Sequence, residues 1–134
     1  MNLTFQRRTD LALRALRRLS VTPGSMPGAE LATALGTTTA FLPQVMSPLV
    51  RAGWVVSDRG PGGGYRITDE GRSVSILDVV ERTEGHPPNG RCVLRDEPCP
   101  GEQSCGIHPV WAEARGVLIE GLSRIPAVPQ GATK

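Results

Sequence analysis

The sequence predicts a mainly helical fold with a small β-hairpin, and its first half provides the main observation. Residues 29–52 hold a short helical segment, a glycine-containing turn and a second helical segment, and residues 54–68 hold two short strands around a glycine-rich loop. This order is typical of a winged helix-turn-helix. A separate amphipathic segment at residues 109–125 predicts a long C-terminal dimerisation helix.

The first helix is predicted over residues 6–20. Its apolar residues recur at helical spacing, and arginines occupy the other faces. The apolar positions are Leu11, Ala12, Ala15, Leu16 and Leu19. A connector with two Pro-Gly pairs follows and ends this helix.

The helix-turn-helix is predicted from helices over residues 29–35 and 40–52. Gly36 suits the left-handed position that ends the first of them, and the threonines at 37–39 are N-cap candidates for the second. Pro43 is tolerated in a first helical turn. Pro48 is expected to kink the second helix or to break one of its hydrogen bonds.

The wing is predicted from strands over residues 54–58 and 64–68. The loop between them contains Arg59, Gly60, Gly62 and Gly63. Glycine has no Cβ atom, so the backbone of this loop can approach a sugar-phosphate chain closely. A flexible hairpin tip is the alternative, and the position directly after two helices favours the wing.

The second half of the chain begins with a helix and continues into a cysteine-rich loop. Ser75 and Asp78 form a variant of the capping box at the start of a helix that runs to about Glu84. A loop of about twenty residues follows, which is long enough to be functional or disordered. The apolar stripe of the last helix fits a second copy of the chain, and packing on its own domain is the alternative. It comprises Val110, Trp111, Ala114, Val117, Leu118, Leu122 and Ile125.

We therefore expect four parts. They are a winged helix-turn-helix domain (1–70), a helix with the cysteine loop (71–108), the dimerisation helix (109–125) and a disordered tail (126–134).

Composition and charge point to a nucleic-acid partner and away from a membrane. The net charge of the 134-residue chain is +2, but residues 1–66 carry eight arginines and three acidic residues, whereas residues 67–134 carry a balance of −3. A basic half is the electrostatic signature expected of a surface that meets phosphate. Because the sequence has neither a secretory signal nor an apolar run of about 20 residues, we expect a soluble cytoplasmic protein. It also lacks catalytic and nucleotide-binding patterns, so we do not expect an enzyme.

Three cysteines, Cys92, Cys99 and Cys105, lie within the predicted loop. Structural zinc usually uses closely paired cysteines, whereas these are separated by six and five intervening residues. A loop that delivers thiolates one at a time favours an iron–sulfur cluster, with zinc and unligated thiols as the alternatives. Three thiolates leave a fourth position for another residue. His108, three residues after the last cysteine, and Asp10 on the first helix are the candidates, and the spacing favours His108.

Several motifs together resemble the Rrf2 family of bacterial regulators over about residues 1–125. Residues 1–4 and 9–16 are similar to the opening helix of that family, and residues 59–65, Arg-Gly-Pro-Gly-Gly-Gly-Tyr, are similar to its wing. Residues 75–80 resemble the next helix, and the three cysteines stand where the family has its cluster ligands. Family members often carry a proline at the position of Pro48, whereas Pro43 is unusual.

Two subtypes of the family compete. In the NsrR-like nitric-oxide sensors, the aspartate that matches Asp10 ligates the cluster of the opposite subunit. In the IscR-like regulators of cluster supply, the histidine that matches His108 is the ligand. The longer match around residues 9–14 favours the nitric-oxide sensor. We expect a 4Fe-4S cluster, with 2Fe-2S as the alternative, and a regulator that senses through thiols without a cluster is a further possibility.

The resemblance implies a homodimeric repressor that binds a palindromic double-stranded DNA operator. Its two recognition helices would enter successive major grooves. Nitric oxide or a redox signal would act on the cluster and weaken DNA binding. Bases would be met by Thr38, Thr39, Ala40 and Gln44, and phosphates or the minor groove by Arg51, Arg59, Gly60, Gly62 and Gly63.

Overall fold

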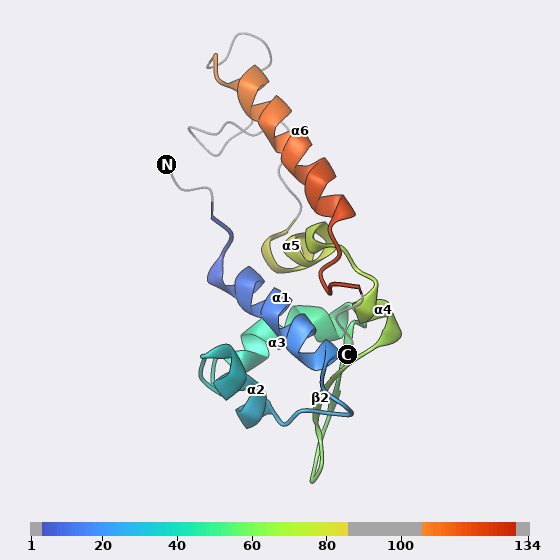
Figure 1. The fold of residues 1–134 in the computed structure, drawn as a ribbon. Coiled ribbons are helices and arrows are strands. Elements are labelled where there is room, and N and C mark those ends of the chain that lie inside the picture. Colours follow the sequence, from blue (N-terminus) through green and yellow to red (C-terminus); the bar gives the residue numbers. More distant parts are fainter. Residues whose placement is uncertain (1–3, 86–105, 131–134) are drawn as a thin grey trace.

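The computed structural model describes residues 4–85 and 106–130 (Figure 1). Six helices and two strands make up this part of the chain. They are α1 (Arg7–Ser20), α2 (Gly28–Leu35), α3 (Leu42–Arg51), β1 (Val55–Asp58), β2 (Gly64–Ile67), α4 (Asp69–Arg72), α5 (Ile76–Glu84) and α6 (His108–Arg124). The fold class expected from the sequence is confirmed.

Helix α1 forms the centre of the winged domain, where it packs against α2, α3 and α5. The five apolar residues of its predicted stripe are buried, as is Thr9. The Thr9 hydroxyl lies 2.8 Å from the Thr83 hydroxyl on α5, and it also donates a hydrogen bond to the Glu84 carboxylate. The N-terminal end of α1 is therefore joined to the C-terminal end of α5 by a partly buried polar contact.

Helices α2 and α3 form the helix-turn-helix. Gly36 ends α2 at a φ of 71°, in the left-handed region predicted for it. Helix α3 begins two residues later than predicted, because Thr38 stabilises a turn before it. The Thr38 hydroxyl accepts a hydrogen bond from the Phe41 N–H, and its carbonyl accepts one from the Leu42 N–H, each at 3.1 Å. Pro48 lies inside α3, and the helix continues to Arg51.

Strands β1 and β2 form the predicted antiparallel hairpin, in a register that pairs Val55 with Ile67 and Asp58 with Gly64. Met26, just before α2, also pairs with Tyr65 through two hydrogen bonds of 2.8 Å. The hairpin is thus fixed to the connector that enters the helix-turn-helix.

Helix α5 begins with the predicted capping box. The Ser75 N–H donates to the Asp78 carboxylate at 2.8 Å, and the Asp78 N–H donates to the Ser75 hydroxyl at 3.1 Å. The short helix α4, which the sequence reading did not predict, precedes it and is capped by Thr68.

Helix α6 projects away from the winged domain (Figure 1), and the chain after it turns back toward that domain. The prediction of a disordered tail over residues 126–134 is wrong for residues 126–130. Ala127 is fully buried and Val128 is 5% exposed, and both belong to the hydrophobic core. Two small apolar residues between prolines show no periodicity, so burial by distant elements could not be read from the sequence. Residues 131–134 lie outside the described part of the chain.

Within the described residues, no helix is both long enough and apolar enough to cross a membrane.

Candidate nucleic-acid interface

The outer face of α3 is polar. Val45, Met46 and Leu49 are buried toward the core. Gln44, Ser47 and Arg51 are exposed at spacings of three and four residues, so they form one stripe along the helix. Gln44 and Arg51 were expected here. Ser47 was missed, although its position one turn from each of them is a signal that the sequence carries.

The turn before α3 exposes Thr38, Thr39 and Ala40, as expected of residues that meet a partner. Because the Thr38 hydroxyl accepts a bond from Phe41, its hydrogen remains available for donation to a partner.

The first turn of α3 offers side chains and few backbone donors. The N–H groups of Phe41 and Leu42 are bonded to Thr38, and the Gln44 N–H is bonded to the Phe41 carbonyl. Pro43 has no N–H. Helix N-termini often bind phosphate through free N–H groups, and here three are occupied and one is missing.

The glycines of the wing have two different roles. Gly60 and Gly62 have φ angles of 88° and 78°, and a Cβ atom at either would meet no other atom within 4 Å. They leave open space for an approaching backbone. A Cβ atom at Gly63 would instead clash with the Asp58 carbonyl oxygen, so Gly63 is needed for the turn itself.

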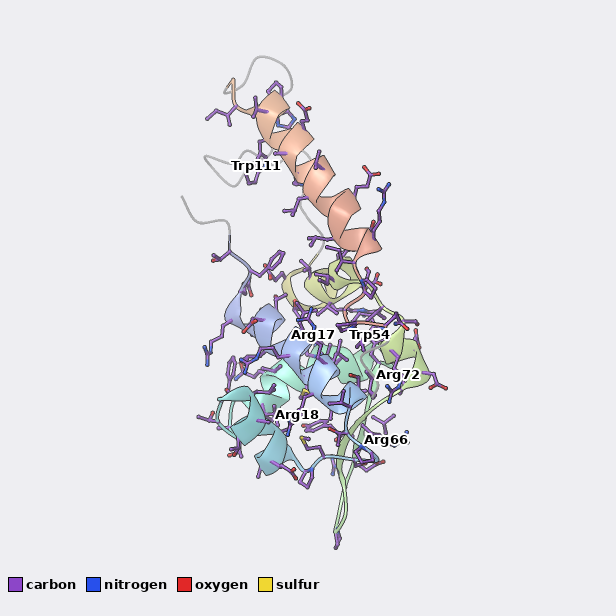
Figure 2. All side chains as sticks on the ribbon, in the orientation of Figure 1. Arg17, Arg18, Trp54, Arg66, Arg72 and Trp111 are labelled. Atoms are coloured by element: carbon purple, nitrogen blue, oxygen red, sulfur yellow. The ribbon has the colours of Figure 1, made fainter. Side chains whose placement is uncertain are left out.

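The arginines at the wing and on α3 differ in whether an acidic residue neutralises their charge. The Nε atom of Arg66, labelled in Figure 2, lies 3.4 Å from the carboxylate of Asp58, the last residue of β1 before the wing loop. Among the residues that the structure describes, Arg51 and Arg59 have no ion-pair partner, and both are exposed. The two arginines therefore leave positive charge on the side of α3 and of the wing tip.

The candidate cluster ligands are only partly within the described residues. Cys92, Cys99 and Cys105 lie outside them. Asp10 is exposed on α1, and its carboxylate lies 3.7 Å from the Arg14 guanidinium in an exposed ion pair. His108 begins α6, and its Nδ1 atom is buried without a hydrogen-bond partner among the described residues.

Within one chain, the structure does not bring Asp10 and His108 together, because the His108 end of α6 is the end farther from α1 (Figure 1). Over residues 4–85 and 106–130, no three His, Cys, Asp or Glu side chains gather as a metal site.

Helix α6 has two different faces. One face is half-buried, and it contains Trp111, Arg115, Ile119 and Leu122. The other face is apolar and exposed, and it includes Val110 at 70%, Val117 at 68% and Leu118 at 53%. Ala114 and Gly121 lie at helical spacing on the same exposed face. The single stripe predicted from the sequence is thus divided between the two faces.

A helix-turn-helix followed by a β-hairpin that is hydrogen-bonded to it defines a winged helix-turn-helix protein. In this protein a further helix, α6, projects from that domain. The comparisons with known proteins give its family. The model described as "Iron-dependent Transcriptional regulator" matches residues 5–126, and the chain belongs to this family, the Rrf2 family.

Three known proteins illustrate the relationship. The chain is 36% identical over 117 residues to the transcriptional repressor NsrR of Streptomyces coelicolor, a match that covers 85% of this chain and 78% of that protein. It is 30% identical over 100 residues to the transcriptional regulator IscR of Vibrio campbellii, covering 75% of this chain. The structure of CymR, the global cysteine regulator of Bacillus subtilis, superposes with a TM-score of 0.74 at 23% identity over 94% of each chain.

These relatives bear on function to different degrees. The aligned region spans only 59% of the length of the IscR protein, and the likeness to CymR shows the fold alone. NsrR and IscR are transcriptional regulators and not enzymes, in agreement with the expectation from the sequence.

Proposed function

We propose that this chain is a DNA-binding transcriptional repressor that acts as a cytoplasmic homodimer on a palindromic operator. The observation that carries the proposal is the polar stripe of Gln44, Ser47 and Arg51 on α3, next to a wing with open glycine positions. Side chains of this kind read base edges in the major groove and bind phosphate.

Each part of this surface has a separate role in the proposal. Gln44 and Ser47 meet base edges, because their side chains donate and accept hydrogen bonds. Arg51, at the last turn of α3, binds a phosphate beside the groove. Arg59 and the backbone at Gly60 and Gly62 enter the minor groove or follow the phosphates, while the Asp58–Arg66 pair joins the two strands next to the loop.

Thr38, Thr39 and Ala40 meet the DNA at the entry to α3. Because Phe41 and Leu42 have already used their N–H groups, we assign this contact to side chains and not to the helix terminus. The free hydroxyl hydrogen of Thr38 is then a donor for a phosphate or a base.

Dimerisation is assigned to the exposed apolar face of α6. Val110, Val117 and Leu118 would lose contact with water in a second copy of the same helix, which is a favourable change. The small residues Ala114 and Gly121 allow two helices to approach closely. A palindromic operator follows from the two-fold symmetry of such a dimer.

We propose an iron–sulfur cluster, 4Fe-4S in preference to 2Fe-2S, on Cys92, Cys99 and Cys105, with Asp10 of the other subunit as the fourth ligand. Such a cluster supplies iron that reacts with nitric oxide or oxidants. The Asp10 carboxylate suits this role because it is exposed and has only an exposed ion pair at 3.7 Å to give up. Loss of the cluster would release Asp10, and with it α1 of the other subunit. The dimer would then shift toward a state that binds DNA weakly.

A second candidate, an IscR-like regulator of cluster supply, is favoured by His108. Its buried Nδ1 atom without a hydrogen-bond partner among the described residues is unusual for an imidazole nitrogen, and ligation would satisfy it. In this candidate the fourth ligand comes from the same segment as the cysteines, so Asp10 has no part in it.

The first experiment compares anaerobically purified wild type with Asp10→Ala and His108→Ala, using visible absorption and native mass spectrometry. Asp69→Ala, which removes an exposed acid on α4, is the matched control. We expect Asp10→Ala to lose or destabilise the cluster and the other two variants to keep it. Loss confined to His108→Ala supports the second candidate. Wild type with no iron contradicts the cluster and leaves a thiol-based sensor.

The DNA-binding surface is tested separately, with a duplex selected by the wild-type protein from a random-sequence pool. We expect Arg51→Ala to weaken binding about tenfold at low salt and to lower the dependence of log K on log salt by about one. Arg124→Ala removes an exposed arginine of α6 that is ion-paired with Glu120, far from the proposed DNA-binding face, and should leave both unchanged. Equal salt dependence for Arg51→Ala and wild type would contradict the assignment, as would a pool in which no duplex is enriched.

A further inference from the structure

The chain after α6 forms a short strap, residues 125–130, that is hydrogen-bonded to the winged domain. The Ile76 N–H donates to the Ile125 carbonyl at 2.8 Å, and the Ala127 N–H donates to the Val74 carbonyl at 2.9 Å. Between these two bonds, Ser75 and Pro126 form an antiparallel bridge. The strap is thus paired with the segment that enters α5.

The side chains of the strap continue this attachment into the core. Ala127 and Val128 are buried in the same hydrophobic cluster as the apolar face of α1. The Nε atom of Arg17, on α1, donates to the Ala127 carbonyl at 2.9 Å, and the Gln130 amide donates to the Arg72 carbonyl at 3.3 Å. Arg17 and Arg72 come from separate elements of the winged domain (Figure 2). One short segment therefore touches α1, α4 and the start of α5.

Among the described residues, helix α6 meets the winged domain chiefly at α5, along a face that is only half-buried. It packs against α5, but none of its residues is buried. Figure 1 shows it projecting from the domain, with its C-terminal end at the strap. A helix attached along one half-buried face can pivot, whereas a helix that continues directly into a hydrogen-bonded and buried segment is held in a defined direction. The strap therefore supplies the fixed point from which α6 extends.

We propose that the strap is a coupling device that fixes the direction of α6 relative to the winged domain and thereby sets the separation of the two DNA-binding halves in a dimer. This inference rests on the proposed dimeric DNA binding. With the strap docked, both recognition helices meet their half-sites together, and the second contact has a high effective concentration. With the strap released, each half still binds DNA, but the two are no longer held at one spacing.

The test uses full-length variants and three DNA probes. Ala127→Asp places a carboxylate in a fully buried position and should release the strap. Arg17→Met, at an exposed position of α1, removes the side-chain bond to the Ala127 carbonyl together with one positive charge, so it remains informative if the first variant does not fold. Pro129→Ala, at an exposed strap position, is the matched control. The probes are the palindrome selected by wild type, one half-site, and the palindrome with two base pairs inserted between its half-sites.

We expect Ala127→Asp to bind the palindrome about tenfold more weakly and to bind the half-site unchanged. The inserted base pairs should then cost the variant less affinity than they cost wild type. Arg17→Met should show the same pattern to a smaller extent, and Pro129→Ala should match wild type. Hydrogen exchange at the Ile76 and Ala127 amides reports independently whether the strap is released.

Faster exchange at these two amides, together with a wild-type spacing preference and palindrome affinity, would overturn the inference. Equal loss of half-site and palindrome binding would overturn it as well, because the strap would then only support the fold of the DNA-binding half. Failure of the wild-type protein to select any duplex is a different result, since it contradicts the proposed function before the variants are compared.

Discussion

At the scale of single residues, backbone contacts decide which glycines of the wing can be replaced. Gly64 has a φ of 145°, and a Cβ atom there would clash with the carbonyl oxygen of Met26. That carbonyl also accepts the Tyr65 N–H at 2.8 Å, so it cannot move away without losing the bond that fixes the hairpin to the helix-turn-helix. Gly62 also has a positive φ, but the space around it is open.

We therefore expect Gly64→Ala to lower the free energy of unfolding by about 2 kcal/mol or more, because it adds a backbone clash to an unfavourable conformation. Gly62→Ala is the matched control and should cost about 1 kcal/mol, from its positive φ alone. Chemical denaturation of both variants gives the two values. Equal destabilisation would show that the Met26–Tyr65 pairing does not restrict the wing.

At the scale of elements, local patterns predicted most of the fold. Residues 6–20 and 29–35 became α1 and α2 within one residue, because apolar spacing and the left-handed Gly36 are local signals. The capping box at Ser75 is equally local, and it was predicted correctly. Two details were set by contacts that the pattern does not contain. Thr38 forms a turn that delays the start of α3, and Thr68 caps the four-residue helix α4, which was not predicted.

The elements that sequence reasoning missed depend on tertiary contacts. The strap contains only two buried apolar residues. Its hydrogen-bond partners, Val74 and Arg17, are distant in the sequence, so its attachment becomes apparent only in the folded structure. Ser47 was missed for a different reason: its helical spacing from Gln44 and Arg51 was available in the sequence, but a serine has no distinctive chemistry that draws attention to it. Asp10 and His108 are the two candidate fourth ligands that the sequence offers, and they differ in a property that only the structure gives, the exposure of the side-chain atom that would bind the metal.

At the scale of the whole molecule, the chain consists of a well-packed winged domain and an arm whose apolar surface is mostly outside. The core of the winged domain draws on α1, α2, α3 and α5 and on the strap, whereas α6 contributes no buried residue. An isolated chain would expose Val110, Val117 and Leu118 together on one helix face. Contiguous exposed apolar surface of this kind marks an interaction site, and an identical helix from a second copy would cover it symmetrically.

This arrangement predicts that assembly and folding can be separated by one substitution. Val117 is 68% exposed and lies on the apolar face of α6, so Val117→Glu would bury two like charges in a symmetric dimer but would leave a monomer unstrained. We expect the variant to sediment as a monomer and to keep the thermal stability of the winged domain. Ala112→Glu adds the same charge at an exposed position on a different face of the helix and should remain dimeric.

Because a monomer still presents Gln44, Ser47 and Arg51, Val117→Glu should retain half-site binding and lose its advantage on the palindrome. A dimeric Val117→Glu protein would place the subunit interface elsewhere, and a monomer with full palindrome affinity would show that the two DNA-binding halves act independently.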